Sequence, residues 1–180
     1  MGFLKYFIKS IDTTNAWIGR LAHNLLFVIF SLLLVEVFRR YLFNAPTTWA
    51  NELVQLIFGA YAILTGGEVL RINGHVNVDI LYAKFPPKTR AACDIVTSIM
   101  FFLFAGMFIW MGWEMAWESL SRFETSESAW NPPIWPFKMM IPIGGALLFL
   151  QGVSKLIQNL YILLGIRIEA KTEVQGGHPV

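Results

Sequence analysis

Charged residues stand inside stretches that are otherwise apolar enough to cross a membrane, and they gather near the ends of those stretches. One group is Glu36, Arg39, Arg40, Glu52, Glu114, Glu118 and Lys138, and the other is Glu68, Asp94 and Lys155. A charge at the centre of a membrane helix costs about 2.5–3.5 kcal/mol on insertion scales, so each residue needs a partner or a role in transport. The middle of each stretch holds no acid or base, which argues against a proton or ion pathway. Ion pairing between helices is the chemistry that this distribution predicts.

The sharpest of these expectations concerns Arg40 and Glu52, which flank the turn between the first two stretches. We expect them to pair across this hairpin and to fix its angle. The alternative is that Arg40 binds lipid phosphates while Glu52 faces water. The sequence also places Glu114 and Glu118 at the depth of Lys138, and Lys155 level with Glu68 and Asp94, so that opposite charges cluster at two depths.

Small and polar residues form a second pattern, in the second apolar stretch. They recur at steps of three and four, which places them on one face of a helix: Glu52, Gln55, Gly59, Ala62 and Gly66. Small residues let membrane helices approach closely, because association in lipid depends on packing and hydrogen bonds. The stripe predicts a helix contact, either within this chain or with another subunit.

Signatures of catalysis or cofactor binding are missing from the sequence. It has no phosphate-binding loop, zinc-protease, nucleophile-elbow or dinucleotide motif, so we expect neither an enzyme nor a cofactor. The single cysteine, Cys93, excludes an internal disulfide. His23 and His75 leave one alternative open, a haem held between the first two stretches of a membrane anchor in a respiratory complex.

Four elements must position these residues, and they predict an all-α integral membrane four-helix bundle. The chain is 56% hydrophobic and 14% charged, far from the balance of a soluble domain. Since crossing ~30 Å of hydrocarbon takes about 20 helical residues, we expect spans at roughly 17–38, 48–70, 92–117 and 136–164. The net charge of +2 and the absence of a basic stripe argue against nucleic acid as a partner.

The two ends of the chain fall outside this four-helix domain. Residues 1–16 alternate apolar and charged residues at helical spacing, which predicts a short amphipathic helix at the membrane surface; the alternative is an extension of the first span. A second such element is expected at Val76–Phe85. The polar tail, residues 165–180, is expected to be disordered.

Lysine and arginine are distributed unevenly between the two sides of the predicted bundle. Nine lie with the termini and the middle connection, against four on the other side. Because cytoplasmic segments carry the excess of these residues, the count predicts that both termini are cytoplasmic.

Two motifs carry a resemblance to a known family. The first hairpin reads Arg40-Tyr41-Leu42-Phe43-Asn44-Ala45-Pro46, with Trp49 and Glu52 following, and the middle connection reads Gly74-His75-Val76-Asn77-Val78-Asp79. In this order and on four spans, they resemble the small membrane subunit of tripartite ATP-independent periplasmic (TRAP) transporters, the DctQ-like family.

The resemblance implies a non-catalytic subunit of a sodium-driven importer of organic acids in a bacterial or archaeal inner membrane. It implies two protein partners, a large membrane subunit, which this chain scaffolds, and a periplasmic substrate-binding protein, and it implies contact with membrane lipid. The candidate partner-interface residues are Arg40, Trp49, Glu52, Gln55, Gly59, Gly66, Gly74, His75 and Asp79.

Overall fold

The computed structural model describes residues 2–72 and 86–164. Gly74, His75 and Asp79, the expected amphipathic element at 76–85 and the tail after residue 164 lie outside the described residues. The expectations for them remain predictions.

Four helices make up the described chain: α1 (Gly2–Leu42), α2 (Ala50–Arg71), α4 (Pro87–Ser121) and α5 (Trp135–Leu163). All four are long and apolar enough to cross a membrane, which confirms the predicted helical membrane bundle. Asn44, in the predicted turn after α1, adopts a positive φ of 46°, and Pro86-Pro87 precedes and begins α4.

The first helix differs from its predicted span. It runs without a break from Gly2 to Leu42, so residue 16 does not mark the end of an element. Of the two arrangements that the sequence allowed, the structure has the continuous helix. Ile8 and Ile11, on the apolar face of the amphipathic stretch, are buried against the rest of the protein. At about 1.5 Å per residue, α1 is roughly 61 Å long, about twice the hydrocarbon thickness.

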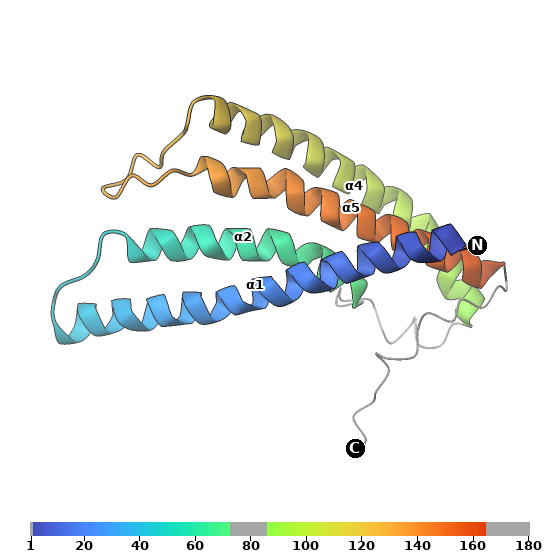
Figure 1. Cartoon of the computed structure of the whole chain (residues 1–180), viewed down its shortest axis with the longest axis horizontal. Coiled ribbons are helices and arrows are strands. Elements are labelled where there is room, and N and C mark those ends of the chain that lie inside the picture. The colour runs from blue at the N-terminus through green and yellow to red at the C-terminus, as the bar shows by residue number, and fades with distance from the viewer. Residues whose placement is uncertain (1, 73–85, 165–180) are drawn as a thin grey trace, which may run out of the picture.

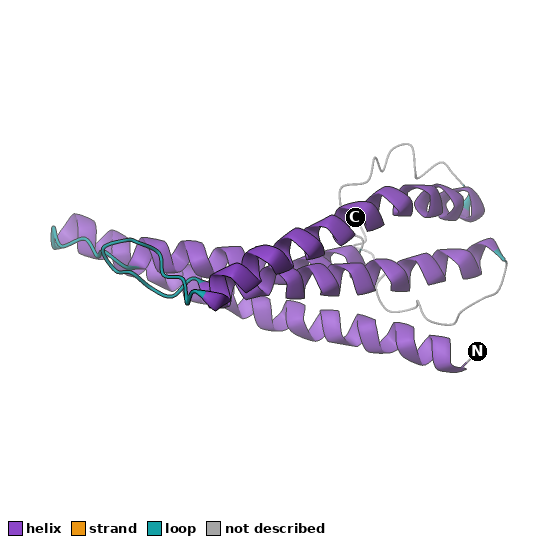
Figure 2. Cartoon of the chain, turned by 90° about the horizontal axis from the view of Figure 1, so that it is seen from above, coloured by secondary structure: helices purple, strands orange, loops and turns teal. Residues whose placement is uncertain are grey.

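The helices form an open row rather than a closed square. α1 packs on α2, α2 on α5 and α5 on α4, and α1 reaches α5 more weakly. Figure 1 shows α2 and α5 in the middle, with α1 and α4 at the two edges. The view from above shows the helices spreading apart toward the end that holds the amino terminus (Figure 2). We call this the amino-terminal end, and the end with the two connecting turns the hairpin end.

α5 is the helix around which the others pack. Its Gly144 lies against Ile63 of α2, so a Cβ there would clash. On the opposite side, Gly145 meets Phe108 and Gly152 meets the ring of Phe101, both on α4. These glycines bring helix backbones close together, which is the main source of attraction between helices in lipid.

Candidate partner-binding site

At the hairpin end, the structure does not pair Arg40 with Glu52. Arg40 lies one turn from Glu36 and binds it at 2.9 Å, while Glu36 also accepts hydrogen bonds from the backbone and hydroxyl of Thr47. The expected ion pair across the hairpin is therefore wrong. The physical reason is that Glu36 lies one helical turn before Arg40 on the same helix, so it is the nearer partner.

Glu52 instead holds the loop that joins α4 to α5. Its carboxylate accepts hydrogen bonds from the hydroxyls of Ser126 and Ser128, the second at 2.6 Å. Beside it, the ring of Trp49 meets that of Trp130 in the same loop, with centroids 6.3 Å apart. Two of the predicted site residues, Trp49 and Glu52, thus join the first helical hairpin to the second.

The sequence places Lys138 at the depth of Glu114 and Glu118, and in the structure its partner is a residue of the neighbouring loop. Lys138 binds Glu124 at 2.5 Å, and Glu118 pairs with Arg122 one turn later. This bond with Lys138 is the main reason that the pKa of Glu124 lies below its ordinary value. Backbone hydrogen bonds hold Glu124 between the two helices: its N–H donates to the carbonyl of Ser119 in α4, and its carbonyl accepts from the N–H of Ile134, just before α5.

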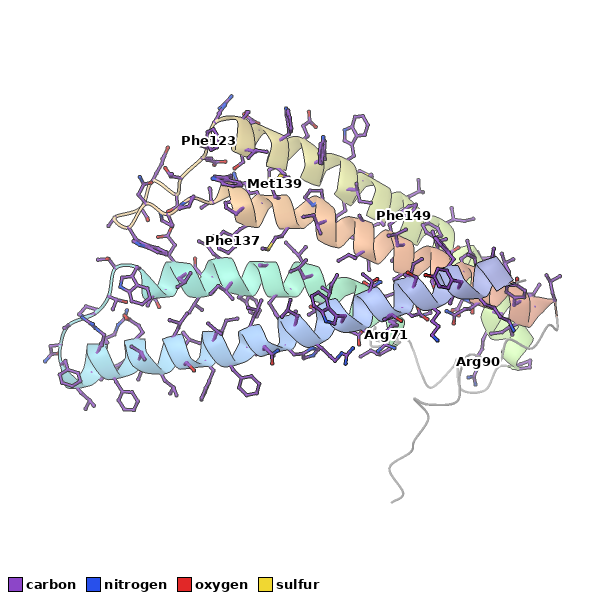
Figure 3. The ribbon with its side chains drawn as sticks, in the orientation of Figure 1. Arg71, Arg90, Phe123, Phe137, Met139 and Phe149 are labelled. Carbon is purple, nitrogen blue, oxygen red and sulfur yellow. The ribbon has the colours of Figure 1, made fainter. Side chains whose placement is uncertain are left out.

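At the amino-terminal end, both acids that the sequence places level with Lys155 are hydrogen-bonded in the structure. Glu68 binds Arg71, one turn along α2, through two hydrogen bonds of 2.6 and 2.8 Å. Asp94 accepts a hydrogen bond from Asn159 across α4 and α5. Figure 3 shows Arg71 and Arg90 toward this end, and Phe123 at the opposite one.

A buried polar cluster joins α1 to α5 at this end, and sequence reasoning did not find it. Asn15 donates to Gln151 at 2.8 Å, and Gln151 in turn donates to Asp12 at 2.8 Å. Ser154 donates to the same Asp12 oxygen. Asn15, Gln151 and Ser154 are at most 2% exposed. We call these four residues the buried clasp.

Two glycines make room for polar side chains where α1 crosses α2. Gly67 lies directly against the amide of Asn15, and Gly19 lies against the side chain of Glu68. Each helix thus receives a side chain from the other, which fixes their register. The sequence signal for this contact was visible as polar residues at helical spacing, Asp12 and Asn15 on α1 and Gln151 and Ser154 on α5.

The predicted stripe on α2 points mostly away from its neighbours. A Cβ on Gly59 would meet nothing within 4 Å, and one on Gly66 would only touch Leu148 at 3.9 Å. Gln55 and Ala62 are exposed. The close contacts of α2 are made by the adjacent positions Ile63 and Gly67 instead. The stripe predicted a helix contact either within this chain or with another subunit. The structure largely excludes the first, within the described residues.

The other exposed helix faces have a different composition. α1 and α4 present large apolar side chains along most of their exposed length, including Phe27, Phe30, Leu103 and Met107. On α2, between Trp49 and Ile72, the one large exposed apolar residue in the described structure is Phe58. Large apolar faces suit lipid, whereas a face of glycine, alanine and amide suits close helix packing.

The side chain of His23 is engaged in contacts within the chain and is not oriented to bind a haem. Its Nδ1 atom lies 2.5 Å from the carbonyl oxygen of Gly19, to which it donates, and its ring meets Tyr61 edge-on. His75 lies outside the described residues.

These features define a helical membrane protein. Its two helical hairpins contact each other at both ends, and the small-residue face of α2 lies mostly uncovered. The family model of the DctQ component of tripartite ATP-independent periplasmic transporters matches residues 29–161. The chain belongs to this family, as the hairpin motif indicated. A transporter family does not support the haem-anchor alternative.

Two relatives sharpen this assignment. The chain is 25% identical, over 81% of its length and 83% of the relative's, to the sialic acid TRAP transporter small permease protein SiaQ of Vibrio cholerae. It is 28% identical over 105 residues to the sialic acid TRAP transporter permease protein SiaT of Haemophilus influenzae. That match covers 58% of this chain but only 17% of SiaT. In the second relative, a segment like this chain is one part of a much longer permease.

Proposed function

We propose that this chain is a non-catalytic small permease subunit that scaffolds the large membrane subunit of a sodium-driven TRAP importer. The observation that carries the proposal is the open stripe of α2, formed by Gln55, Gly59 and Ala62. Elsewhere on the middle helices, small residues accommodate a neighbouring helix, as Gly67 and Gly144 do. Gly59 has none within 4 Å in the described chain. A partner's membrane helix fits this position.

The relatives support a large permease as that partner. One is named a small permease protein, which implies a larger counterpart, and the other contains the matching segment within a longer permease chain. Fusion of a segment to its partner is natural where the two must stay together. Sialic acid, named for both relatives, carries a carboxylate, so an organic acid is the proposed substrate class. The periplasmic substrate-binding protein completes the proposed complex.

A pair of glycine substitutions tests the docking face. Gly59→Leu fills the open stripe and should reduce co-purification with the large permease at least several-fold. Gly106→Leu is the matched control, because Gly106 on α4 also has nothing within 4 Å of a built Cβ. It should leave the complex intact. Equal recovery of the large subunit with both variants would show that α2 is not the docking face.

The scaffold role is tested by reconstitution. The chain alone in liposomes, under a sodium gradient, should take up no sialic acid or other organic acid, whereas the complete transporter should. Sodium-dependent uptake by the isolated chain would contradict a purely scaffolding role.

The proposed orientation places both termini in the cytoplasm of a cell with an inner membrane. Reporter domains fused after Val180 and inserted between Arg122 and Trp130 should therefore give opposite results. A cytoplasmic reporter should be active at the first site and a periplasmic reporter at the second. The reverse pattern would invert the bundle.

A further inference from the structure

Contacts between neighbouring helices fix which residues stand level along the helix axes. The ring of His23 on α1 meets Tyr61 on α2, with centroids 6.3 Å apart. Gly144 on α5 lies against Ile63 on α2. These contacts set the register of the first three helices in the row, α1, α2 and α5.

The last pair is aligned in the same way. Gly112 on α4 lies against Ile141 on α5, and Asn159 on α5 donates to Asp94 on α4 at 3.3 Å. Counting from these contacts along the helices places Phe30 of α1 level with Trp117 of α4, and Thr13 of α1 level with Met100 of α4.

The residues that mark a membrane boundary are not level in this register. At the hairpin end they are Arg39 and Arg40 on α1, the start of α2 at Ala50, Lys138 on α5, and Trp113 and Trp117 on α4. Charged residues and tryptophan favour the interface between hydrocarbon and water. From α1 to α4, this boundary moves about 19 Å toward the amino-terminal end, at 1.5 Å per residue.

The boundary at the opposite end moves in the same direction. It is marked by Arg20 on α1, Arg71 on α2, Lys155 on α5 and Asp94 on α4. Counted in the same register, it shifts by about 21 Å from α1 to α4. Two sets of residues, chosen at opposite ends of the helices, therefore give nearly the same displacement.

Exposed apolar side chains show the same stagger. On α1 they form a dense run from Leu26 to Leu42, and on α4 from Val96 to Trp117. Along the row, the run on α4 lies closer to the amino-terminal end than the run on α1. Between Lys5 and Arg20, by contrast, most exposed residues of α1 are polar.

We infer that the row of helices crosses the bilayer tilted within its own plane. At the hairpin end, where α1 and α4 form the two edges of the row, a displacement of about 20 Å across three interhelix spacings of about 9 Å corresponds to a tilt of roughly 35°. Membrane helices tilt by about 0–40°, so this lies near the upper end of the range. The about 17 to 21 residues between the two boundaries then span roughly 21–26 Å along the membrane normal, and the lysine and arginine side chains extend that reach.

The tilt accounts for the position of the amino-terminal part of the long helix α1. Asp12 is level with Gln151 and Ser154, to which it is hydrogen-bonded. In the tilted row, residues 2–16 of α1 lie on the aqueous side of the boundary while the neighbouring parts of α4 remain in the membrane. The polar outer face of this segment then meets headgroups and water. This inference requires only that the chain spans a bilayer and does not depend on the proposed partner.

Two pairs of level residues test the tilt, because an upright row would place the members of each pair at equal depth. Phe30, Trp117 and Met100 are between 59% and 73% exposed, and Thr13 is also exposed, so each accepts a cysteine and a fluorescent label. The full chain would carry Cys93→Ala and one of Phe30→Cys, Trp117→Cys, Thr13→Cys or Met100→Cys, in lipid nanodiscs. Quenching by a spin-labelled lipid is then compared with quenching by aqueous iodide.

We expect the labels at residues 30 and 100 to be quenched several-fold more by the lipid quencher than those at residues 117 and 13. Iodide should show the opposite order. The same ratio of lipid to iodide quenching at both members of either pair would overturn the tilt. Circular dichroism and elution volume show whether each variant keeps the fold, so that only folded variants are compared.

Discussion

At the amino-terminal end, the hydrogen bonds that join the first hairpin to the second are made by Asn15, Gln151 and Ser154, which are almost fully buried. At the hairpin end, the same kind of bond links Glu52 to Ser128 in an exposed loop. Burial increases the contribution of such a hydrogen bond to stability. A buried polar group that loses its partner costs about 1–3 kcal/mol, whereas an exposed one is satisfied by water. We therefore expect substitutions at the amino-terminal end to reduce the stability of the fold more than substitutions at the hairpin end.

The largest expected effect comes from Gly67, where α1 and α2 exchange side chains. Gly67→Val would force a side chain into the amide of Asn15 and toward the backbone of Leu147. Overpacking of this kind costs about 1–3 kcal/mol or more. The variant should lose several degrees of melting temperature in detergent, measured by tryptophan fluorescence.

Gly66→Val is the matched control for this prediction. It lies one residue away in the same helix, yet its built Cβ only touches Leu148 at 3.9 Å. Its melting temperature should stay close to that of the unmodified chain. If both variants melt together, the reciprocal contact at Gly67 is not what holds α1 against α2.

The next effect comes from Gln151, the residue that bridges Asn15 and Asp12. Gln151→Ala removes a hydrogen-bond partner from each and leaves Asn15 with its bond to the Ile11 carbonyl and Asp12 with the bond from Ser154; we expect a cost of about 1–3 kcal/mol. In a double-mutant cycle with Asn15→Ala, the combined loss should be smaller than the sum of the two single losses. Strict additivity of the melting shifts would mean that the buried clasp does not act as one network.

At the hairpin end, the same kind of change should matter less. Ser128→Ala removes one hydrogen bond from Glu52, in a loop where water can replace the lost hydroxyl. We expect a change below about 1 kcal/mol in stability. The readout is the same melting experiment, and a shift as large as that of Gln151→Ala would remove the contrast between the two ends.

The sequence predicted the four helices because each is a long apolar stretch bounded by turn residues, and composition alone identifies such elements. It did not predict the partners of charged residues, as Arg40 and Glu52 show. Charge and depth indicate which residues are near each other, but a neighbour one turn away, such as Glu36, competes with one across a hairpin. The buried clasp was missed because Gln151 and Asp12 are 139 residues apart, so only the packing of α1 on α5 brings them together.

The smallest expected effect is the response of the hairpin end to acid. The hydrogen bond from Lys138 lowers the pKa of Glu124 relative to its ordinary value near 4.5. A carboxyl group whose pKa is depressed by folding contributes stability above its unfolded pKa, and this contribution is lost as the pH falls through the folded pKa. The contact should therefore persist at neutral pH and weaken only below about pH 4.5. Carbon NMR of the labelled Glu124 carboxyl group, titrated in detergent micelles, would show its midpoint below 4.5. Lys138→Met removes the donor and should move that midpoint upward. A midpoint that does not change in this variant would assign the shift to another neighbour and remove this ion pair from the contacts that hold the hairpin end.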